Sequence, residues 1–195
     1  LVAAARGKAD IATMLLAAGA RTDAKDAQGL TAIGTAAGAD NAELIRLLAA
    51  NRADVNATDA DGATPLARAA AADRRKAVMA LLAAHADVNR ATVSGNTPLM
   101  LASQRGLQDT VRLMVDAKAN LDQKNAVGDT ALHLAARGQH IEVAALLLSR
   151  GANPGIANSK RLNANDVARL TGNTSLIAVF DSASKDQNWL SGWFH

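Results

Sequence analysis

A single spacing runs through most of this chain and limits what it can fold into. Glycine recurs at intervals of 33 residues, at Gly29, Gly62, Gly95 and Gly128. A threonine follows each of these glycines two residues later, and a leucine or isoleucine lies two residues after each threonine. Self-similarity at one period of this length predicts a repeat array, in which each unit buries its apolar face against its neighbours.

Each unit is predicted to form a turn followed by two short helices. An aspartate three residues before a glycine, as in Asp59 to Gly62, suits a turn with positive φ at the glycine. Thr64 then caps a first helix over 66–72, with Pro65 at its start, where the missing N–H costs nothing. A second helix follows, with apolar residues at helical spacing, and ends at a phase that suits a left-handed cap. That phase holds Gly19, Arg52, His85, Lys118 and Gly151.

Several copies of this unit resemble one known family. The strings Thr130-Ala-Leu-His-Leu-Ala-Ala and Thr64-Pro-Leu-Ala, with Gly151-Ala-Asn, resemble the ankyrin repeat. The resemblance covers nearly the whole chain and implies an all-α solenoid, in which hairpin-like turns project as fingers from paired antiparallel helices. It also implies protein binding on the concave face rather than catalysis. The alanine-rich, cysteine-free composition looks more like bacterial than animal members.

The period divides the chain into one array and a tail. Residues 1–25 match the end of a first repeat. Whole repeats follow at 26–58, 59–91, 92–124 and 125–157. Residues 158–181 keep the phase but become polar outside and carry Arg161 where a turn glycine is expected, which indicates a capping repeat. Because the chain starts at Leu1 inside a repeat, we expect that the full protein has residues upstream of it, which would be a secretory signal, further repeats or another domain.

The tail at 182–195 breaks the period and holds most of the aromatic residues. Its large apolar residues are Trp189, Leu190, Trp193 and Phe194. We expect this tail to fold back over the last helix pair and close the end of the array. The alternative is that it docks on a partner or a second copy, because exposed apolar patches mark interaction sites.

Composition excludes several classes of protein. Hydrophobic residues make up 49% of the chain but aromatic residues only 2%, which suits closely packed thin helices better than an enzyme core. A net charge of +3 is too small to indicate nucleic acid. The absence of cysteine excludes disulfides and thiol chemistry and leaves the compartment open. No apolar run approaches the ~20 residues of a membrane span, so we expect a soluble protein, cytoplasmic, periplasmic or secreted.

No residue pattern predicts catalysis, a cofactor or a metal. In the ankyrin family, the position of His133 makes a structural hydrogen bond to a neighbouring repeat, and that of His140 makes a loop contact. If Asp59-Ala-Asp-Gly were a calcium loop of the EF-hand type, its first and last ligands would be Ala57 and Arg68, which do not coordinate calcium. We therefore interpret both histidines and the Asp-x-x-Gly turn as structural.

The resemblance places a binding groove along the turns and the inward side of the first helices. Fingertip candidates for contact with a partner are Leu30, Val93, Ser94, Asn96, Val127, Asp129, Lys160 and Leu162. Candidates at the ends of the first helices are Gln104, Arg105 and Arg137. Apolar groups beside arginines are typical of binding hot spots, so we expect a groove centred on repeats four to six. The alternative for each apolar residue is packing on the neighbouring finger.

The sequence thus predicts a non-enzymatic protein-binding module, with inhibition of an enzyme or toxin, as by an immunity factor, as a narrower role. It predicts no nucleic-acid partner and no membrane insertion. A competing hypothesis is a scaffold or self-assembling array joined through the incomplete first repeat or through Trp189, Trp193 and Phe194. A third is a non-catalytic region of a larger enzyme, which would need another domain upstream of Leu1.

Overall fold

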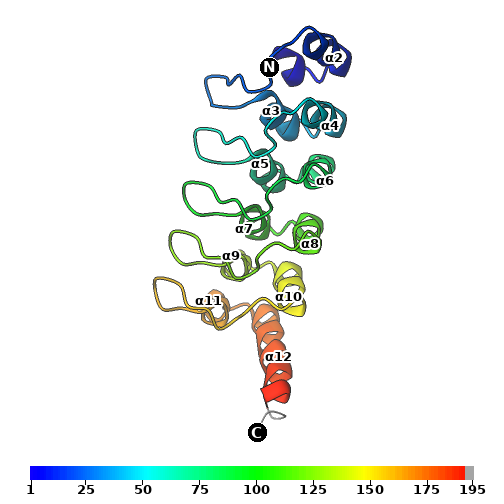
Figure 1. The fold of residues 1–195 in the computed structure, drawn as a ribbon. Coiled ribbons are helices and arrows are strands. Elements are labelled where there is room, and N and C mark those ends of the chain that lie inside the picture. Colours follow the sequence, from blue (N-terminus) through cyan, green and yellow to red (C-terminus); the bar gives the residue numbers. More distant parts are fainter. Residues whose placement is uncertain (192–195) are drawn as a thin grey trace.

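The computed structural model describes the backbone of residues 1–191 and the side chains of residues 1–183. Within that part the chain forms twelve helices and no strand. Figure 1 shows the helices as two parallel columns, with a loop projecting to the same side from each repeat after the first pair. The predicted all-α solenoid is confirmed.

The two columns consist of the first and the second helix of each pair. The first helices are α1 (Val2–Ala5), α3 (Ala32–Gly38), α5 (Pro65–Ala71), α7 (Pro98–Gln104), α9 (Ala131–Arg137) and α11 (Ala164–Thr171). The second helices are α2 (Ala9–Ala17), α4 (Ala42–Ala50), α6 (Arg75–Ala83), α8 (Gln108–Asp116), α10 (Ile141–Ser149) and α12 (Thr174–Ser191). The main contacts join helices of one pair or of neighbouring pairs, so each repeat is stabilised by the repeats beside it.

The predicted threonine caps are present, and the helices begin one residue earlier than expected. The Thr64 hydroxyl accepts a hydrogen bond from the Ala67 N–H at 3.1 Å, and Pro65 is the first residue of α5. In the last repeat a reciprocal cap replaces threonine: Asn163 accepts from the Asp166 N–H at 2.9 Å, and Asp166 accepts from the Asn163 N–H at 3.0 Å. Both arrangements satisfy N–H groups that have no partner within the helix.

Three positions in each repeat have left-handed backbone, one more than the sequence pattern predicts. The turn glycines, Gly62 and Gly95 among them, have φ between +72° and +78°, as the sequence pattern predicts. The second helices end on left-handed residues that are not glycine in the middle repeats, namely Arg52 (φ 63°), His85 (φ 62°) and Lys118 (φ 64°). The third position connects the two helices and holds Gly7, Asp40, Asp73, Gly106, Gln139 and Gly172. Residues other than glycine have a mildly strained backbone at these positions.

The loops form a row of fingers, called the finger ladder below. A side chain accepts hydrogen bonds from the backbone within each finger, and backbone hydrogen bonds join each finger to the next. At the base of one finger, the Asn125 Oδ1 accepts hydrogen bonds from the N–H groups of Val127 (3.1 Å) and Asp129 (2.9 Å). From finger to finger, the Val93 N–H donates to the Asp61 carbonyl at 3.1 Å, and equivalent bonds join the other neighbours. The residue at the start of each turn is therefore a turn former, as predicted for Asp59.

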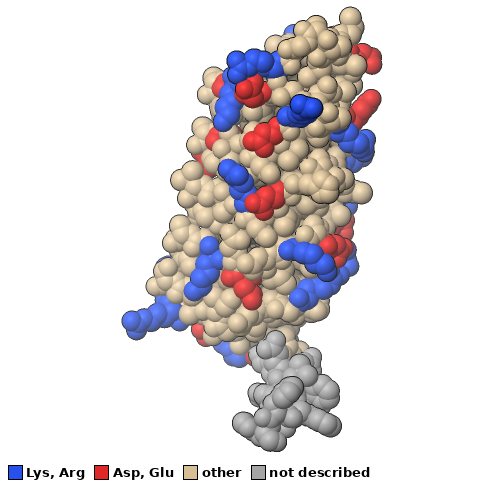
Figure 2. Space-filling view, in the orientation of Figure 1, with Lys and Arg blue, Asp and Glu red and all other residues tan. Residues whose placement is uncertain are grey.

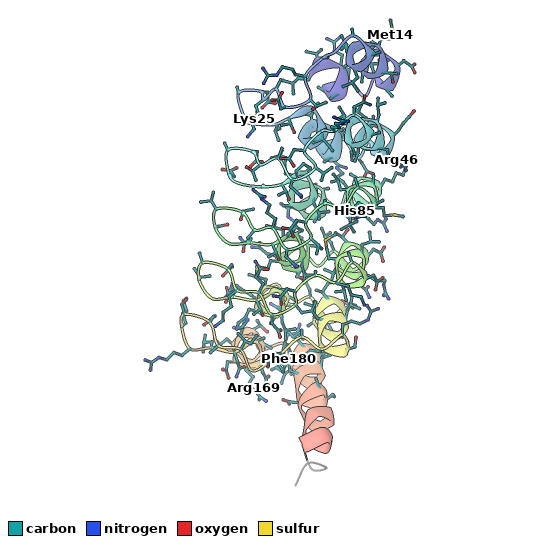
Figure 3. The ribbon with its side chains drawn as sticks, viewed as in Figure 1. Met14, Lys25, Arg46, His85, Arg169 and Phe180 are labelled. Atoms are coloured by element: carbon teal, nitrogen blue, oxygen red, sulfur yellow. The ribbon has the colours of Figure 1, made fainter. Side chains whose placement is uncertain are left out.

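The core repeats along the array and is built mainly from leucine and alanine. Ile33, Leu66, Leu99 and Leu132 are fully or almost fully buried at one phase, and alanines fill the helix faces between them. Small residues let the helices of neighbouring repeats approach closely, which explains how the chain packs with so few aromatic residues. Phe180 is buried near the place where α12 meets α11 (Figure 3).

Ser103 is the one polar interruption in a row of buried alanines. Its side chain is fully buried on α7, and its hydroxyl has no hydrogen-bond partner in the described part of the chain. The equivalent residues of neighbouring repeats are Ala37, Ala70 and Ala136, all fully buried.

Substituting Ser103→Ala is therefore expected to raise the free energy of unfolding by about 1 kcal/mol, because it removes an unpaired buried hydroxyl. Urea denaturation followed by circular dichroism measures the change. A loss of stability would mean that the hydroxyl has a partner after all.

The chain does not turn at residue 182, where the sequence pattern ends. The backbone of residues 182–191 continues α12, which extends past the last finger in Figure 1. The predicted packing of Trp189 and Leu190 concerns side chains outside the described residues, and Trp193 and Phe194 lie outside them altogether.

Candidate partner-binding face

The fingers and the exposed sides of the first helices form one continuous surface, called the finger face below. Of the predicted contact residues, Val93 and Val127 project from the fingertips with 82% and 57% of their surface exposed. Ser94 and Lys160 are exposed on the same row of fingertips. None of these four belongs to the buried core, so the fold leaves them available.

Three other fingertip candidates are engaged within the protein. Leu30 and Leu162 are half-buried, and Leu162 packs against the core. Asn96 accepts a hydrogen bond from the Asn125 amide of the next finger at 2.9 Å. Leu162 and Asn96 thus have partners within the protein, and their contact with a binding partner stays a prediction.

Asp129 was expected at the partner surface, and this prediction is wrong. Its side chain is only 1% exposed and accepts hydrogen bonds from Arg137 Nη1 at 2.7 Å and from Asn158 Nδ2 at 2.8 Å. The Asn158 Oδ1 in turn accepts the Lys160 N–H at 2.9 Å, so the carboxylate helps to hold the last finger. The fold turns this carboxylate inward because two donors from neighbouring elements converge on it.

Two predicted arginines at the ends of the first helices differ in their engagement. The Arg137 guanidinium is half-exposed and is paired with the buried Asp129. Arg105, the C-cap residue of α7, is exposed and has no ion pair with any described residue. Gln104 is also exposed, and its backbone carbonyl faces the His140 Nε2 at 3.0 Å. Arg105, like Lys160, is thus an exposed charged candidate without an ion pair to any described residue.

The two histidines of repeat five have the structural roles that the resemblance implies. The His133 Nδ1 accepts the Thr130 N–H at 3.2 Å, and its Nε2 lies 3.0 Å from the Leu162 carbonyl of the next repeat. These partners require the neutral tautomer with hydrogen on Nε2. The His140 ring bridges to the Gln104 carbonyl of the previous repeat.

Burial and hydrogen bonds shift the pKa values of this buried cluster. Burial lowers the pKa of His133 below its ordinary value, against the opposing influence of the Leu162 carbonyl and of Asp129. Burial alone would raise the pKa of Asp129, but hydrogen bonds from Arg137 and Asn158 and the Arg137 charge together hold it lower than usual. Both shifts therefore favour a neutral His133 and an ionised Asp129 at neutral pH.

The lowered pKa of His133 predicts a loss of stability in mild acid. Below the ordinary histidine pKa of 6.5 the unfolded chain takes up a proton that the folded protein still refuses. The free energy of unfolding should therefore fall as pH drops below that value, with a slope of at most about 1.4 kcal/mol per pH unit. Urea denaturation between neutral and mildly acidic pH tests this. His133→Gln should remove the slope due to this group, and an unchanged slope would contradict the assignment.

A shallow depression of about 430 Å³ lies in the finger face on repeats two to four. Its floor consists mainly of small residues on α3 and α5, and Leu101 forms its apolar wall. Arg68 and Arg105 also line it. No motif in the sequence indicated this depression. The signal was Ala71, whose equivalents in the later repeats are larger, and Ala72, which is followed one repeat later by Arg105.

A second buried carboxylate, that of Asp59, forms an ion pair with Arg68 that the sequence pattern did not suggest. The Arg68 Nη1 lies 2.9 Å from the Asp59 Oδ2, and the Asp59 side chain is only 3% exposed. This pair fixes the arginine beside the depression, at the base of the third repeat's finger. The expected centre of the groove on repeats four to six stays a prediction, and the depression lies nearer to the N-terminus.

Charge on the molecular surface is mixed. Figure 2 shows basic and acidic side chains interspersed over the face in view, without a large patch of one sign. Among the described residues, no group of three or more His, Asp or Glu side chains is placed to hold a metal ion. No described helix is both long and apolar enough to cross a bilayer.

Comparison with known proteins bears directly on this arrangement. A family model described as ankyrin repeats (3 copies) matches residues 1–92 and again residues 81–158. No curated protein matches the chain. The two matches together span the first five helix pairs.

Proposed function

The chain belongs to the ankyrin repeat family, and on that premise we propose that it is a non-enzymatic module that holds a protein partner against its finger face. Ankyrin repeats are generally protein–protein interaction modules and typically lack catalytic activity. The described residues agree with this, because the buried Asp129 and His133 have structural hydrogen-bond partners: Asp129 accepts from Arg137 and Asn158, and His133 bonds to Thr130 and to the Leu162 carbonyl.

The observation that carries the proposal is large apolar surface on the fingertips that the fold does not use. Val93 and Val127 are mostly exposed, whereas every other leucine, isoleucine and valine of repeats four and five is buried or half-buried. Exposed apolar groups on the same face as an arginine without an ion pair to a described residue, here Arg105, favour a protein contact with a desolvated centre and a charged rim.

The narrower role that we propose is inhibition of an enzyme or toxin by occlusion of its site. Hydrogen bonds join every finger to the next, so the finger face is formed before any partner binds. A preformed surface loses little conformational entropy on association, and this favours the tight binding that an inhibitor needs.

An affinity pull-down with mass spectrometry tests the proposed function. The bait is the full chain, compared with a finger-face variant carrying Val93→Asp, Arg105→Glu and Val127→Asp. A matched control carries Met79→Asp, Ala50→Asp and Arg112→Glu, all exposed positions on the second helices. Circular dichroism establishes that all three proteins fold.

We expect a partner that the wild type and the control retain and that the finger-face variant loses, with affinity reduced at least about 100-fold. Equal recovery by all three proteins would place binding elsewhere and contradict the proposal. A partner lost only by the control would move the binding site to the second helices.

A second candidate function, self-association, is favoured by exposed apolar side chains of the first helix pair. Large apolar side chains gather there on α1 and α2, and Figure 3 shows Met14 pointing outward at this end. They are Leu1 (40% exposed), Val2 (69%), Ile11 (49%), Met14 (72%) and Leu15 (48%). Light scattering over a range of concentrations distinguishes the two functions, because a scaffold would gain mass with concentration and Met14→Asp would reverse the gain.

A further inference from the structure

The depression on repeats two to four exists because of the size of three residues at the ends of the first helices. The equivalent positions move along the array in steps of 33 residues, and they hold Gly38, Ala71, Gln104, Arg137 and Leu170. The first two are small, whereas the remaining three are exposed and large. Ala72 is likewise small, whereas the equivalent residue of the next repeat is Arg105. Small residues of repeats two and three therefore form the floor of the depression, and Leu101 and Arg105 of repeat four form its side.

Two arginines line this depression, a third lies beside it, and none of the described residues that line it is acidic. Arg105 reaches the wall without an ion pair to any described residue. Arg74 donates from Nε to the carbonyl of Gly38, a lining residue, at 3.1 Å. Arg68 lies on the third side, held by the buried carboxylate of Asp59. Among the described residues, Asp59 is the one ion-pair partner of these three arginines, which leaves an excess of positive charge beside an apolar floor.

The nearest acidic residues along the chain do not neutralise this site. Asp73, the neighbour of Arg74, accepts a hydrogen bond from the Thr110 hydroxyl at 2.7 Å, and Asp40 accepts one from the Ala77 N–H at 2.8 Å. Both carboxylates thus face the second helices of the following repeat. Their position leaves the arginine side of the depression open to an anion supplied by another molecule.

We propose that this depression receives a large aliphatic or aromatic side chain from an acidic segment of the protein partner. The inference rests on the proposed function and specifies the chemistry of the partner. Leu101, Ala67 and Ala71 offer apolar contact for the inserted side chain. Carboxylates on either side of that side chain would meet Arg105 and Arg74. Burial of the apolar group also excludes water, which strengthens the charge-assisted hydrogen bonds at the rim.

The volume of the depression fits one anchor with its flanking backbone. About 430 Å³ exceeds the volume of any single side chain but lies at the small end of sites that enclose a whole ligand. An extended segment with one apolar anchor and neighbouring acidic residues is therefore the matching occupant, and a basic or purely polar segment is not.

Selection from a phage library of random dodecapeptides on the immobilised full chain tests the proposal. Enriched peptides are then measured by fluorescence polarisation against two variants of the depression, Ala71→Trp, which fills the floor, and Arg105→Glu, which reverses the rim charge. Their controls are Ala50→Trp and Arg112→Glu, which make the same changes at exposed positions on α4 and α8.

Enriched peptides should combine a large apolar residue with neighbouring carboxylates. Each variant of the depression should weaken them at least about tenfold, and each control less than about twofold. Peptides without carboxylates, equal binding by the variants, or no enrichment would overturn the inference. A labelled single-stranded DNA that binds the same site in their place would also overturn it.

The failure of this inference can be distinguished from failure of the proposed function. Peptides that are lost on Val93→Asp and Val127→Asp but bind Ala71→Trp and Arg105→Glu normally would leave the finger face as a binding site and refute the acidic anchor. Peptides that bind every one of these variants equally would contradict both.

Discussion

Replacing Gly95 by alanine is expected to lower the free energy of unfolding by about 2–4 kcal/mol, although the side chain gained is only a methyl group. The backbone of Gly95 has φ +78°, and an added Cβ would lie 2.8 Å from the backbone nitrogen of Ala126 and 3.0 Å from the Cα of Asn125. Those atoms belong to the next finger, so the methyl group cannot be accommodated by turning a side chain. The finger ladder would have to open at this step.

Gly151→Ala is the matched control for this prediction. Gly151 has φ +90° but no atom within 4 Å of the added Cβ, so alanine there meets the backbone penalty alone. We expect a loss of about 1 kcal/mol. Urea denaturation of both variants measures the difference, and equal losses would show that the contact between fingers contributes little.

The second large effect is expected at the buried carboxylate of repeat five. Asp129→Ala should cost about 2–3 kcal/mol, because the buried Asn158 amide loses its acceptor and remains unpaired. Arg137 contributes less to this loss, since its half-exposed guanidinium can return to water. Chemical denaturation monitored by circular dichroism measures the change.

The position one repeat earlier gives the control for the buried carboxylate. Asn96 lies 33 residues before Asp129, is half-buried and accepts one hydrogen bond from Asn125. Asn96→Ala should therefore cost about 1 kcal/mol or less. An equally large loss in both variants would mean that the penalty comes from the finger in general and not from the buried carboxylate.

The repeat pattern was enough to predict the fold, because the features that define each unit are local. Both Thr-Pro pairs of the chain, such as Thr64 and Pro65, begin a helix. The positive φ of a turn glycine such as Gly62 sets the conformation of the finger that precedes the helix. The third left-handed position was harder to see. Gly7 and Gly106 carry its signal at multiples of the period, but Asp40, Asp73 and Gln139 interrupt it.

The candidate site was predictable only in part, because contacts between repeats depend on pairs of residues. Val93 and Val127 are exposed as their fingertip position indicates. Asp129 has the same position on its finger as Leu30 and Asn96, and nothing in a single repeat shows that Asn158 will meet it. The burial of Asp129 follows from that pairing across 29 residues.

The turn glycine is absent from the last finger for a reason that the contact between fingers supplies. Arg161 occupies this phase with φ 61°, and within the described residues no further finger packs on it. A side chain is tolerated there because its only cost is that of the left-handed backbone conformation. The glycine in the other fingers is therefore required by the neighbour as much as by the turn.

A ladder of this kind also bears on how such a chain can change in length. Most of its bonds between repeats join a residue to one lying about one period away, as in Val93 to Asp61 or Arg74 to Gly38. Duplication or deletion of a whole repeat by recombination would preserve each of these bonds with a new partner of the same type. The exceptions are the junctions where two particular side chains meet, such as Asp73 with Thr110, Asn96 with Asn125 and Asp129 with Asn158. Growth of the array is thus least disruptive between repeats two and three, where the described bonds each use a backbone donor or acceptor.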